Sequence, residues 1–521
     1  MDEENGGQRG WGKTLSSLAH PRAVAMLFLG FSAGIPILLI FSTLSVWLRE
    51  AGVSRSAVTF FSWAALAYSF KFLWAPLVDL LPLPLLTRLL GRRRSWLLLA
   101  QSMIIAAICW MGFTDPLASS VSLTTMAMAA VMLGFSSATQ DIVIDAYRIE
   151  SAEKSMQAVL ASMYIAGYRL GMLVAGAGSL YLASWLGTSR EAYQFSAWRQ
   201  TYCIMAAVML VGVITTLLAP EPRRHRQDES RGYPLAKYLR LLLVFFCTAL
   251  AFGLAFFAGG GLIEGWKSIL VARLPLSGLA LGFLLEAGRF LGSISVAGIV
   301  AWLLVRANIC DRPMAYATYV MPIKDFFLRY RLQTALFMLL LIGSYRVSDI
   351  VLGVVSNVFY VDVGFSNNEI ATITKTFGLL MTLAGGFLGG VLTVRYGVMR
   401  ILFVGAVLSS ATNLLFMTLA YAGADISLLT AVIAADNLSG GLASTAFVAF
   451  LSALTSTSFT AGQYAIFSSV MTLFPKLLGG YSGTMVSAFG YENFFLLTAG
   501  VGIPVLVLIW LLRQEIAGEK S

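Results

Sequence analysis

Two aspartates lie four residues apart in an otherwise apolar stretch, at Asp141 and Asp145. This spacing places both carboxylates on one face of a helix. Because two nearby carboxylates resist ionising together, one of them can hold and exchange a proton near neutral pH. That is the chemistry that a proton-coupled carrier needs. The alternative is a structural network, in which Asp145 lies close to the end of its helix and pairs with Arg148.

Basic side chains also interrupt the apolar stretches. Arg169 is expected near the middle of its helix, about 14 residues from the helix start at about 1.5 Å per residue. Its planar guanidinium suits a substrate carboxylate, which it can bind through two hydrogen bonds, and it can also neutralise Asp141. Lys71 either adds a second cation to the site or pairs with a neighbouring aspartate. Arg346 and Asp349 either serve the site or form a local i, i+3 pair.

Polar groups buried in apolar segments are costly, so they are hypotheses for function. We draw three sets of candidates from them. The proton-coupling candidates are Asp141, Asp145, Asp349 and Asp436. The substrate-binding candidates are Lys71, Gln140, Tyr164, Tyr168, Arg169, Arg346, Lys375, Asn437 and Gln463. The loop candidates for gating are Asp79, Arg92, Arg93 and Arg395.

The sequence does not favour an enzyme. It contains no HExxH motif, and we expect neither catalytic residues nor a cofactor. The four cysteines show no CxxC or paired spacing, and no metal site is expected. The two histidines, His20 and His225, lie in polar segments, so carboxylates must carry any proton that moves.

The elements that must position these residues are membrane-spanning helices. Of the 521 residues, 58% are apolar and 12% are charged, against about 45–50% and about 25% in soluble domains. This excludes an ordinary soluble enzyme and predicts an all-α polytopic membrane protein. Apolar stretches of the length of a span predict fourteen helices, at 23-48, 57-81, 95-114, 120-146, 155-186, 200-219, 238-260, 276-304, 332-361, 369-394, 399-422, 427-453, 459-478 and 492-512.

Charge in the loops predicts the orientation. The net charge of +10 follows the loops, and most lysines and arginines fall in every second loop, on the side of both termini. Both termini are therefore expected in the cytoplasm, and the lipid bilayer rather than nucleic acid is the expected surroundings. The two longest polar connections divide the chain into a tail at 1-22, a six-helix bundle at 23-219, linkers with an extra helix pair at 220-331, a second six-helix bundle at 332-512 and a tail at 513-521.

The two bundles carry related loops. Gly91-Arg92-Arg93-Arg94 follows the second helix, and Gly389-Gly390 with Arg395 follows the tenth. Internal repetition of this kind is how secondary transporters are built, with the binding site between the repeats.

Several motifs together resemble AmpG-type permeases of the major facilitator superfamily. They are LGFSAGIP from Leu29, FKFLWAPLVD from Phe70, GRRRSW from Gly91, QDIVIDAY from Gln140, GYRLGMLV from Gly167, KTFGLL from Lys375 and DNLSGGLASTAFVAFL from Asp436. The resemblance implies a major facilitator fold in the bacterial inner membrane. It also implies proton-driven import of anhydromuropeptides from the periplasm, for peptidoglycan recycling and for the signal that induces β-lactamase. A monomer is expected.

This sequence departs from the superfamily pattern at one loop. Eleven residues separate Asp79 from Gly91, where the superfamily motif has an aspartate shortly before Gly-Arg-Arg. The alternative within transport is an exporter of another small solute or drug, although a cavity rich in cations would disfavour cationic drugs. An enzyme or a receptor is disfavoured, because neither a catalytic set nor a sizeable extramembrane domain is seen.

Overall fold

The computed structural model describes residues 19–53, 68, 70–118, 121–153, 156–189, 192–222, 233–271, 278–365, 369–479 and 482–518. The chain divides into two compact units. One contains Met1–Arg223 with Phe326–Ser521, and the other contains Arg224–Asp325. Within the first unit, we call residues 19–222 the N-terminal segment and residues 326–518 the C-terminal segment.

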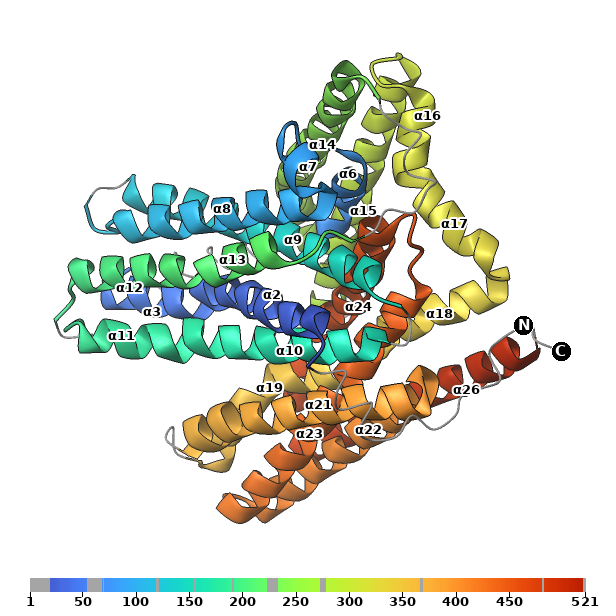
Figure 1. Cartoon of the computed structure of the whole chain (residues 1–521). Helices are drawn as coiled ribbons and strands as arrows, with labels where there is room; N and C mark the ends of the chain where they lie inside the picture. The colour runs from blue at the N-terminus through green and yellow to red at the C-terminus, as the bar shows by residue number, and fades with distance from the viewer. Residues whose placement is uncertain are drawn as a thin grey trace. The chain divides into compact units, whose positions relative to one another are not determined.

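The N-terminal segment is built of helices that run in succession along the chain (Figure 1). They are α2 (Pro21–Leu38), the π-helix η2 (Leu39–Thr43), α3 (Leu44–Glu50), the 3-10 turn η4 (Lys71–Leu73), α6 (Ala75–Leu80), α7 (Leu86–Leu90), α8 (Arg92–Phe113), α9 (Ser122–Ser151), α10 (Gln157–Leu173), the π-helix η6 (Val174–Gly178), α11 (Ser179–Trp185), α12 (Phe195–Val208) and α13 (Leu210–Leu218). Trp47 and Trp198, both fully buried, stack in the apolar core at 5.6 Å between ring centroids.

Helices α2 and α10 pack with their backbones almost in contact. A Cβ atom at Gly30 or Gly34 would collide with the backbone carbonyls of Tyr164 and Tyr168. Gly167 is equally close to the carbonyl of Leu27. Small residues permit this approach, and it fixes the register of α10, which carries the candidate side chains of Tyr164, Tyr168 and Arg169.

The C-terminal segment is also helical. Its elements are α18 (Leu332–Ser344), α19 (Val347–Val363), the π-helix η9 (Ile370–Phe377), α21 (Gly378–Tyr396), α22 (Val398–Ala422), α23 (Ile426–Leu454), α24 (Thr460–Gly479), α25 (Ser482–Gly500) and α26 (Gly502–Gly518). Helices α21 and α23 repeat the glycine packing of α2 and α10, because a Cβ at Gly385 or Gly441 would collide with the backbone of the other helix.

The second unit contains α14 (Leu235–Val271), α15 (Gly278–Arg306), α16 (Arg312–Ala315), the π-helix η8 (Tyr316–Val320) and the start of α17 (Met321–Arg329). Helices α14 and α15 form a hairpin. Arg289 of α15 donates through Nε to the carbonyl of Phe256 at 2.7 Å, and its guanidinium lies 3.9 Å from the centre of that ring. This arginine thus belongs to the packing of the hairpin.

In the described part of the chain, twelve helices are long and apolar enough to cross a membrane. They are Pro21–Leu38, Arg92–Phe113, Ser122–Ser151, Gln157–Trp185, Phe195–Leu218, Leu235–Gly261, Gly288–Arg306, Leu332–Ser356, Thr372–Tyr396, Val398–Ala422, Ile426–Leu454 and Ala488–Arg513.

The prediction of fourteen spans is therefore matched only in part. Of the predicted span 57-81, residues 57–67 and 69 lie outside the described residues, and the described remainder contains only the short elements η4 and α6. The predicted span 459-478 is a helix, α24, but it is not among the twelve. Its amide, hydroxyl and lysine side chains lower its mean hydropathy. A polar helix of this kind belongs inside a bundle rather than against lipid.

Candidate functional site

The two aspartates of α9 are both buried, with 8% of Asp141 and 6% of Asp145 exposed. Asp145 is held by two cations. Its Oδ2 lies 3.7 Å from Nζ of Lys71, and its Oδ1 accepts a hydrogen bond from Arg148 at 3.0 Å. In contrast, Oδ1 of Asp141 is buried with no hydrogen-bond partner in the structure as described. The two carboxylates of the predicted pair thus have different partners.

Aromatic hydroxyls and one amide surround Asp141. The charge of Asp141 acts on Tyr68, Tyr164 and Tyr168, and Lys71 and Asp145 act electrostatically on Asp141 itself. The neighbouring Gln140 is completely buried, and both of its amide atoms lack a hydrogen-bond partner among the residues described. Buried polar atoms without partners are rare and costly, and they mark a place where a ligand or water can bind.

Arg169 and Arg346 bring two positive charges together from different segments. Arg169, half-buried on α10, makes no hydrogen bond or ion pair with any residue in the described ranges, and it interacts electrostatically with Arg346. Arg346 lies at the start of α19, where its Nε is 3.6 Å from Oδ2 of Asp349 and its NH1 donates to Ser444. Two guanidiniums from different segments that interact electrostatically suit an anionic ligand.

The C-terminal segment has its own pair of carboxylates. Asp349 accepts a hydrogen bond from Ser409, and Oδ1 of Asp436 accepts one from Thr412 at 3.3 Å. The charge of Asp349 also acts on Asp436, so the two carboxylates are neighbours although they are far apart in sequence. Both are therefore held by hydroxyl groups in addition to the ion pair of Asp349 with Arg346.

Three other predicted residues have local partners or cannot be placed. Asn437 accepts from Thr382 at 2.9 Å and donates to the carbonyl of Ile433 at 3.0 Å. Gln463 accepts from Arg329 at 2.9 Å and from the backbone of Ser456 at 2.7 Å, at the beginning of α24. The side chain of Lys375 lies outside the described residues.

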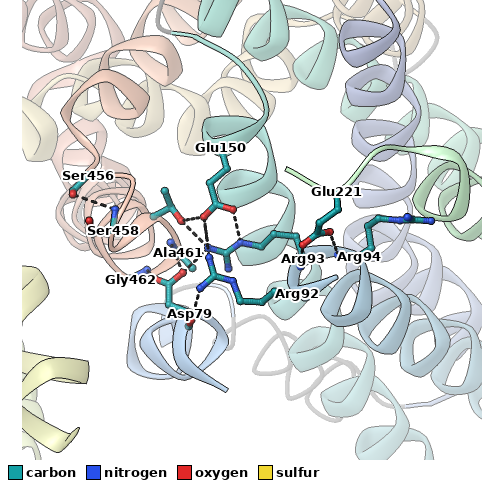
Figure 2. A network of polar contacts seen from close by, with 11 residues as sticks. Asp79, Arg92, Arg93, Arg94, Glu150, Glu221, Ser456, Ser458, Ala461 and Gly462 are labelled. Carbon is teal, nitrogen blue, oxygen red and sulfur yellow. Dashed lines mark hydrogen bonds and ion pairs between the residues drawn. The ribbon is translucent and has the colours of Figure 1, made fainter. Parts of the chain in front are cut away.

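A second charged cluster lies where α8 begins and α9 ends (Figure 2). Arg93 is 1% exposed, and its NH2 lies 2.7 Å from Oδ1 of Asp79 and 2.5 Å from Oε1 of Glu150. The same NH2 donates to Thr460 of α24 at 2.7 Å, and Thr460 donates to Glu150. Arg92 adds a hydrogen bond to the backbone carbonyl of Asp79 at 2.8 Å. We call Asp79, Arg93, Glu150 and Thr460 the loop-end network.

The loop-end network joins the two segments through Asp79. Its carboxylate accepts hydrogen bonds from the backbone of Ala461 at 3.2 Å and of Gly462 at 2.8 Å, in the first turn of α24 (Figure 2). A carboxylate is favoured at a helix N-terminus, where backbone N–H groups are unpaired and the helix dipole is positive. The eleven residues between Asp79 and Gly91, five of which form the short helix α7, do not prevent this contact.

Arg148 forms a third connection between the segments. It is completely buried, and its NH1 donates to Ser452 of α23 at 2.6 Å while its NH2 holds Asp145. Its guanidinium also lies 5.0 Å from the ring centre of Tyr464 on α24. The remaining gating candidate, Arg395, lies at the end of α21 with its guanidinium 5.5 Å from the ring centre of Tyr396.

Comparison with known proteins identifies the family. Residues 23–345 match the model of the Major Facilitator Superfamily. The chain belongs to the major facilitator superfamily. It is 30% identical to the anhydromuropeptide permease of Escherichia coli K12 over 499 residues, which are 95% of this chain and 81% of that protein. It is 29% identical to the putative transporter AmpG 4 of Rickettsia conorii, over 95% of this chain and 97% of that protein.

Solved structures agree on the fold. The superfamily transporter FucP, in the outward conformation, has a TM-score of 0.60 at 12% identity and covers 95% of this chain and 99% of its own. The proton:xylose symporter XylE has a TM-score of 0.56 at 12% identity over 96% of both chains. The resemblance to AmpG-type permeases is thus confirmed, and this major facilitator protein is a transporter rather than an enzyme.

Sequence reasoning missed several charged and polar residues of this major facilitator protein. Glu150, Glu221 and Thr460 were not predicted, although Glu221 accepts hydrogen bonds from the backbones of Arg93 at 2.8 Å and Arg94 at 3.1 Å. Arg148 was seen only as a possible partner of Asp145. These residues lie near helix ends, where charged side chains are ordinary and give no signal against the apolar background.

Proposed function

We propose that this transporter imports anhydromuropeptides by alternating access, using protons that enter from the periplasm. The relationship to the permease of Escherichia coli supports the substrate class. The observation that carries the proposal is Arg169, a half-buried guanidinium without an ion pair within the described ranges, near a second guanidinium of the opposite segment. Muropeptides carry carboxylates, which guanidiniums bind in bidentate geometry.

The two six-helix bundles would be the moving parts, as the sequence repeats suggest. In this proposal Arg169 and Arg346 hold substrate carboxylates between the bundles, with Lys71, Gln140, Tyr164, Tyr168, Lys375, Asn437 and Gln463 as further polar contacts. The loop-end network, together with Arg92 and Arg395, would close the cytoplasmic side and open for release. This assignment of sides rests on the lysines and arginines of the loops, which favour both termini in the cytoplasm and the inner membrane as the location.

Asp141 is our candidate for the proton carrier. Its Oδ1 has no hydrogen-bond partner that the structure describes, whereas Asp145 is held by Lys71 and Arg148. A carboxylate that is buried and weakly paired accepts a proton more easily than one held by two cations. Asp349 and Asp436 are the corresponding candidates of the C-terminal segment. Uptake of this kind would serve peptidoglycan recycling and the signal that induces β-lactamase, with the protein acting as a monomer.

The test is uptake of labelled anhydromuropeptide into cells that lack their own permease. We expect accumulation that a protonophore abolishes, and a loss of at least about 100-fold in Arg169→Ala, because a charge-assisted bidentate contact contributes about 3 kcal/mol. The matched control is Arg513→Ala, which removes an exposed arginine of α26 and should leave uptake unchanged. Absence of uptake by a correctly inserted protein would contradict the proposal, and efflux would favour an exporter of another solute.

A further inference from the structure

The buried charges around α9 are connected in a line that ends in the opposite segment. Asp141 interacts with Lys71, Lys71 lies 3.7 Å from Asp145, and Asp145 accepts from Arg148 at 3.0 Å. Arg148 then donates to Ser452 at 2.6 Å. A change of charge at Asp141 therefore affects the contact of Arg148 with Ser452, through the two ion pairs of Asp145.

The charge balance of this line depends on the proton of Asp141. When Asp141 is ionised, its charge and that of Asp145 balance the charges of Lys71 and Arg148. When Asp141 is protonated, both cations must share Asp145 alone, and one buried positive charge is left without a counter-charge. Burying an unbalanced charge is strongly unfavourable, so this state favours separation of the segments and entry of water.

Among the described residues, the other ionisable groups that interact with these carboxylates do not supply the missing charge. Tyr164 and Tyr464 interact electrostatically with Asp145, and Tyr68, Tyr164 and Tyr168 with Asp141. All are tyrosines, which are neutral near pH 7. The balance within the line thus rests on Asp141, Asp145, Lys71 and Arg148.

We propose that Arg148 is a positioning residue that couples the protonation of Asp141 to the contact between the two segments. With Asp141 ionised, Asp145 holds the guanidinium so that NH1 reaches Ser452, and the segments stay closed at this end. With Asp141 protonated, Lys71 draws Asp145 away, Arg148 loses its orientation, and the contact with Ser452 breaks. The proton passes onto Asp141 from one side and leaves to the other, and no bond besides O–H forms or breaks.

This inference rests on the proposed proton coupling and deepens it. It gives a reason for the complete burial of Arg148, whose hydrogen bonds reach both segments. It also gives the direction of the cycle, because proton binding opens the end at which Arg148 lies. Proton binding from the periplasm then leads to opening toward the cytoplasm, which is the order that import requires.

Ser162 provides a reporter for this opening. It is completely buried on α10, and a Cβ placed at Gly390 of α21 would lie 2.7 Å from its Cβ and Oγ atoms. A cysteine at Ser162 is thus shielded while α10 and α21 are in contact and becomes reactive when they separate. The four native cysteines, Cys109, Cys203, Cys247 and Cys310, are free and are replaced by alanine in the background protein.

The experiment measures alkylation of Ser162→Cys in the full chain, reconstituted in lipid vesicles, without any solute. Rates are divided by those of the unfolded variant at the same pH, which removes the ordinary pH dependence of a thiol. We expect about a tenfold faster normalised rate at about pH 5 than at about pH 8, a change that corresponds to one order of magnitude in the opening equilibrium.

Two substitutions test the role of Arg148. Ser452→Ala removes the hydroxyl that Arg148 contacts, and Arg148→Lys keeps the charge but cannot span Asp145 and Ser452. In each variant the normalised alkylation rate should be high at both values of pH. The rates of one variant at the two pH values should differ by less than about twofold. Thr455→Val is the matched control, because its hydroxyl bonds only the carbonyl of Leu451 among the described residues, and it should behave as the parent.

The outcomes distinguish a failure of this inference from a failure of the proposed substrate assignment. A pH response that survives unchanged in Ser452→Ala overturns the role of Arg148, even if that variant is less stable. A parent protein without a pH response overturns both the inference and the proton assignment. Because the assay contains no solute, failure to transport anhydromuropeptide would leave its result unaffected.

Discussion

The loop-end network and the interior of α9 and α10 are both buried and both charged, yet their carboxylates are satisfied to different degrees. Arg93 contacts two carboxylates and a hydroxyl through NH2, while its buried NH1 has no partner among the described residues, and Asp79 accepts from two backbone N–H groups as well. In the interior, Oδ1 of Asp141 and both amide atoms of Gln140 lack a hydrogen-bond partner as far as the chain is described.

The difference indicates two roles for buried charge in one transporter. Ion pairs in which each carboxylate has several partners hold one arrangement of the two segments, and breaking them is expensive. Groups that lack a partner are costly in the empty protein and become satisfied when a ligand or proton binds. Substitutions should therefore affect stability at the loop-end network and transport in the interior.

The largest effect on stability is expected from Arg93→Ala. It leaves Asp79 and Glu150 buried without their main counter-charge, which costs about 3–5 kcal/mol. Thermal unfolding of the purified protein in detergent should show a clearly lowered midpoint. Arg94→Ala is the control, because the side chain of Arg94 donates to the backbone carbonyls of Thr216 and Leu217 rather than to a carboxylate. Equal unfolding midpoints for Arg93→Ala and Arg94→Ala would contradict the claim that Arg93 supplies the main counter-charge of the network.

A smaller loss is expected from Asp79→Asn. The substitution keeps an oxygen that can accept from the first turn of α24 but removes the charge that favours the helix N-terminus and Arg93, which costs about 1–2 kcal/mol. Its unfolding midpoint should lie between those of the parent and of Arg93→Ala. Asp425→Asn makes the same change at the exposed N-cap of α23, where asparagine caps equally well. If it lowers the midpoint as much as Asp79→Asn does, the special role of Asp79 is refuted.

The sequence predicted some contacts of the interior residues but none of the contacts within the loop-end network. Asp141, Lys71 and Arg169 stand out because each interrupts an apolar segment, and such charges need a reason. The pairs Asp145–Arg148 and Arg346–Asp349 follow from i, i+3 spacing, and both are present at 3.0 Å and 3.6 Å. The i, i+3 spacing was therefore sufficient to predict these two contacts.

Contacts between distant parts of the chain were not predictable in the same way. Thr460 meets Arg93 across 367 residues, and no periodicity or motif connects them. The helix α24 was predicted as an ordinary span. Its polar side chains were not taken as a sign that it lies inside the bundle. Likewise, the sequence did not predict the short helix α7 between Asp79 and Gly91, which is flanked by positive φ values at Leu85 and Gly91.

The most direct test of the account compares Asp141→Asn with the parent in proteoliposomes, with and without an imposed pH gradient. We expect the variant to exchange labelled for unlabelled substrate, since its Oδ1 gives up no hydrogen bond within the described structure. It should lose accumulation driven by the pH gradient, by about 100-fold or more, because an amide cannot carry the proton. Accumulation equal to that of the parent would contradict the central claim that the unpaired interior carboxylate drives transport.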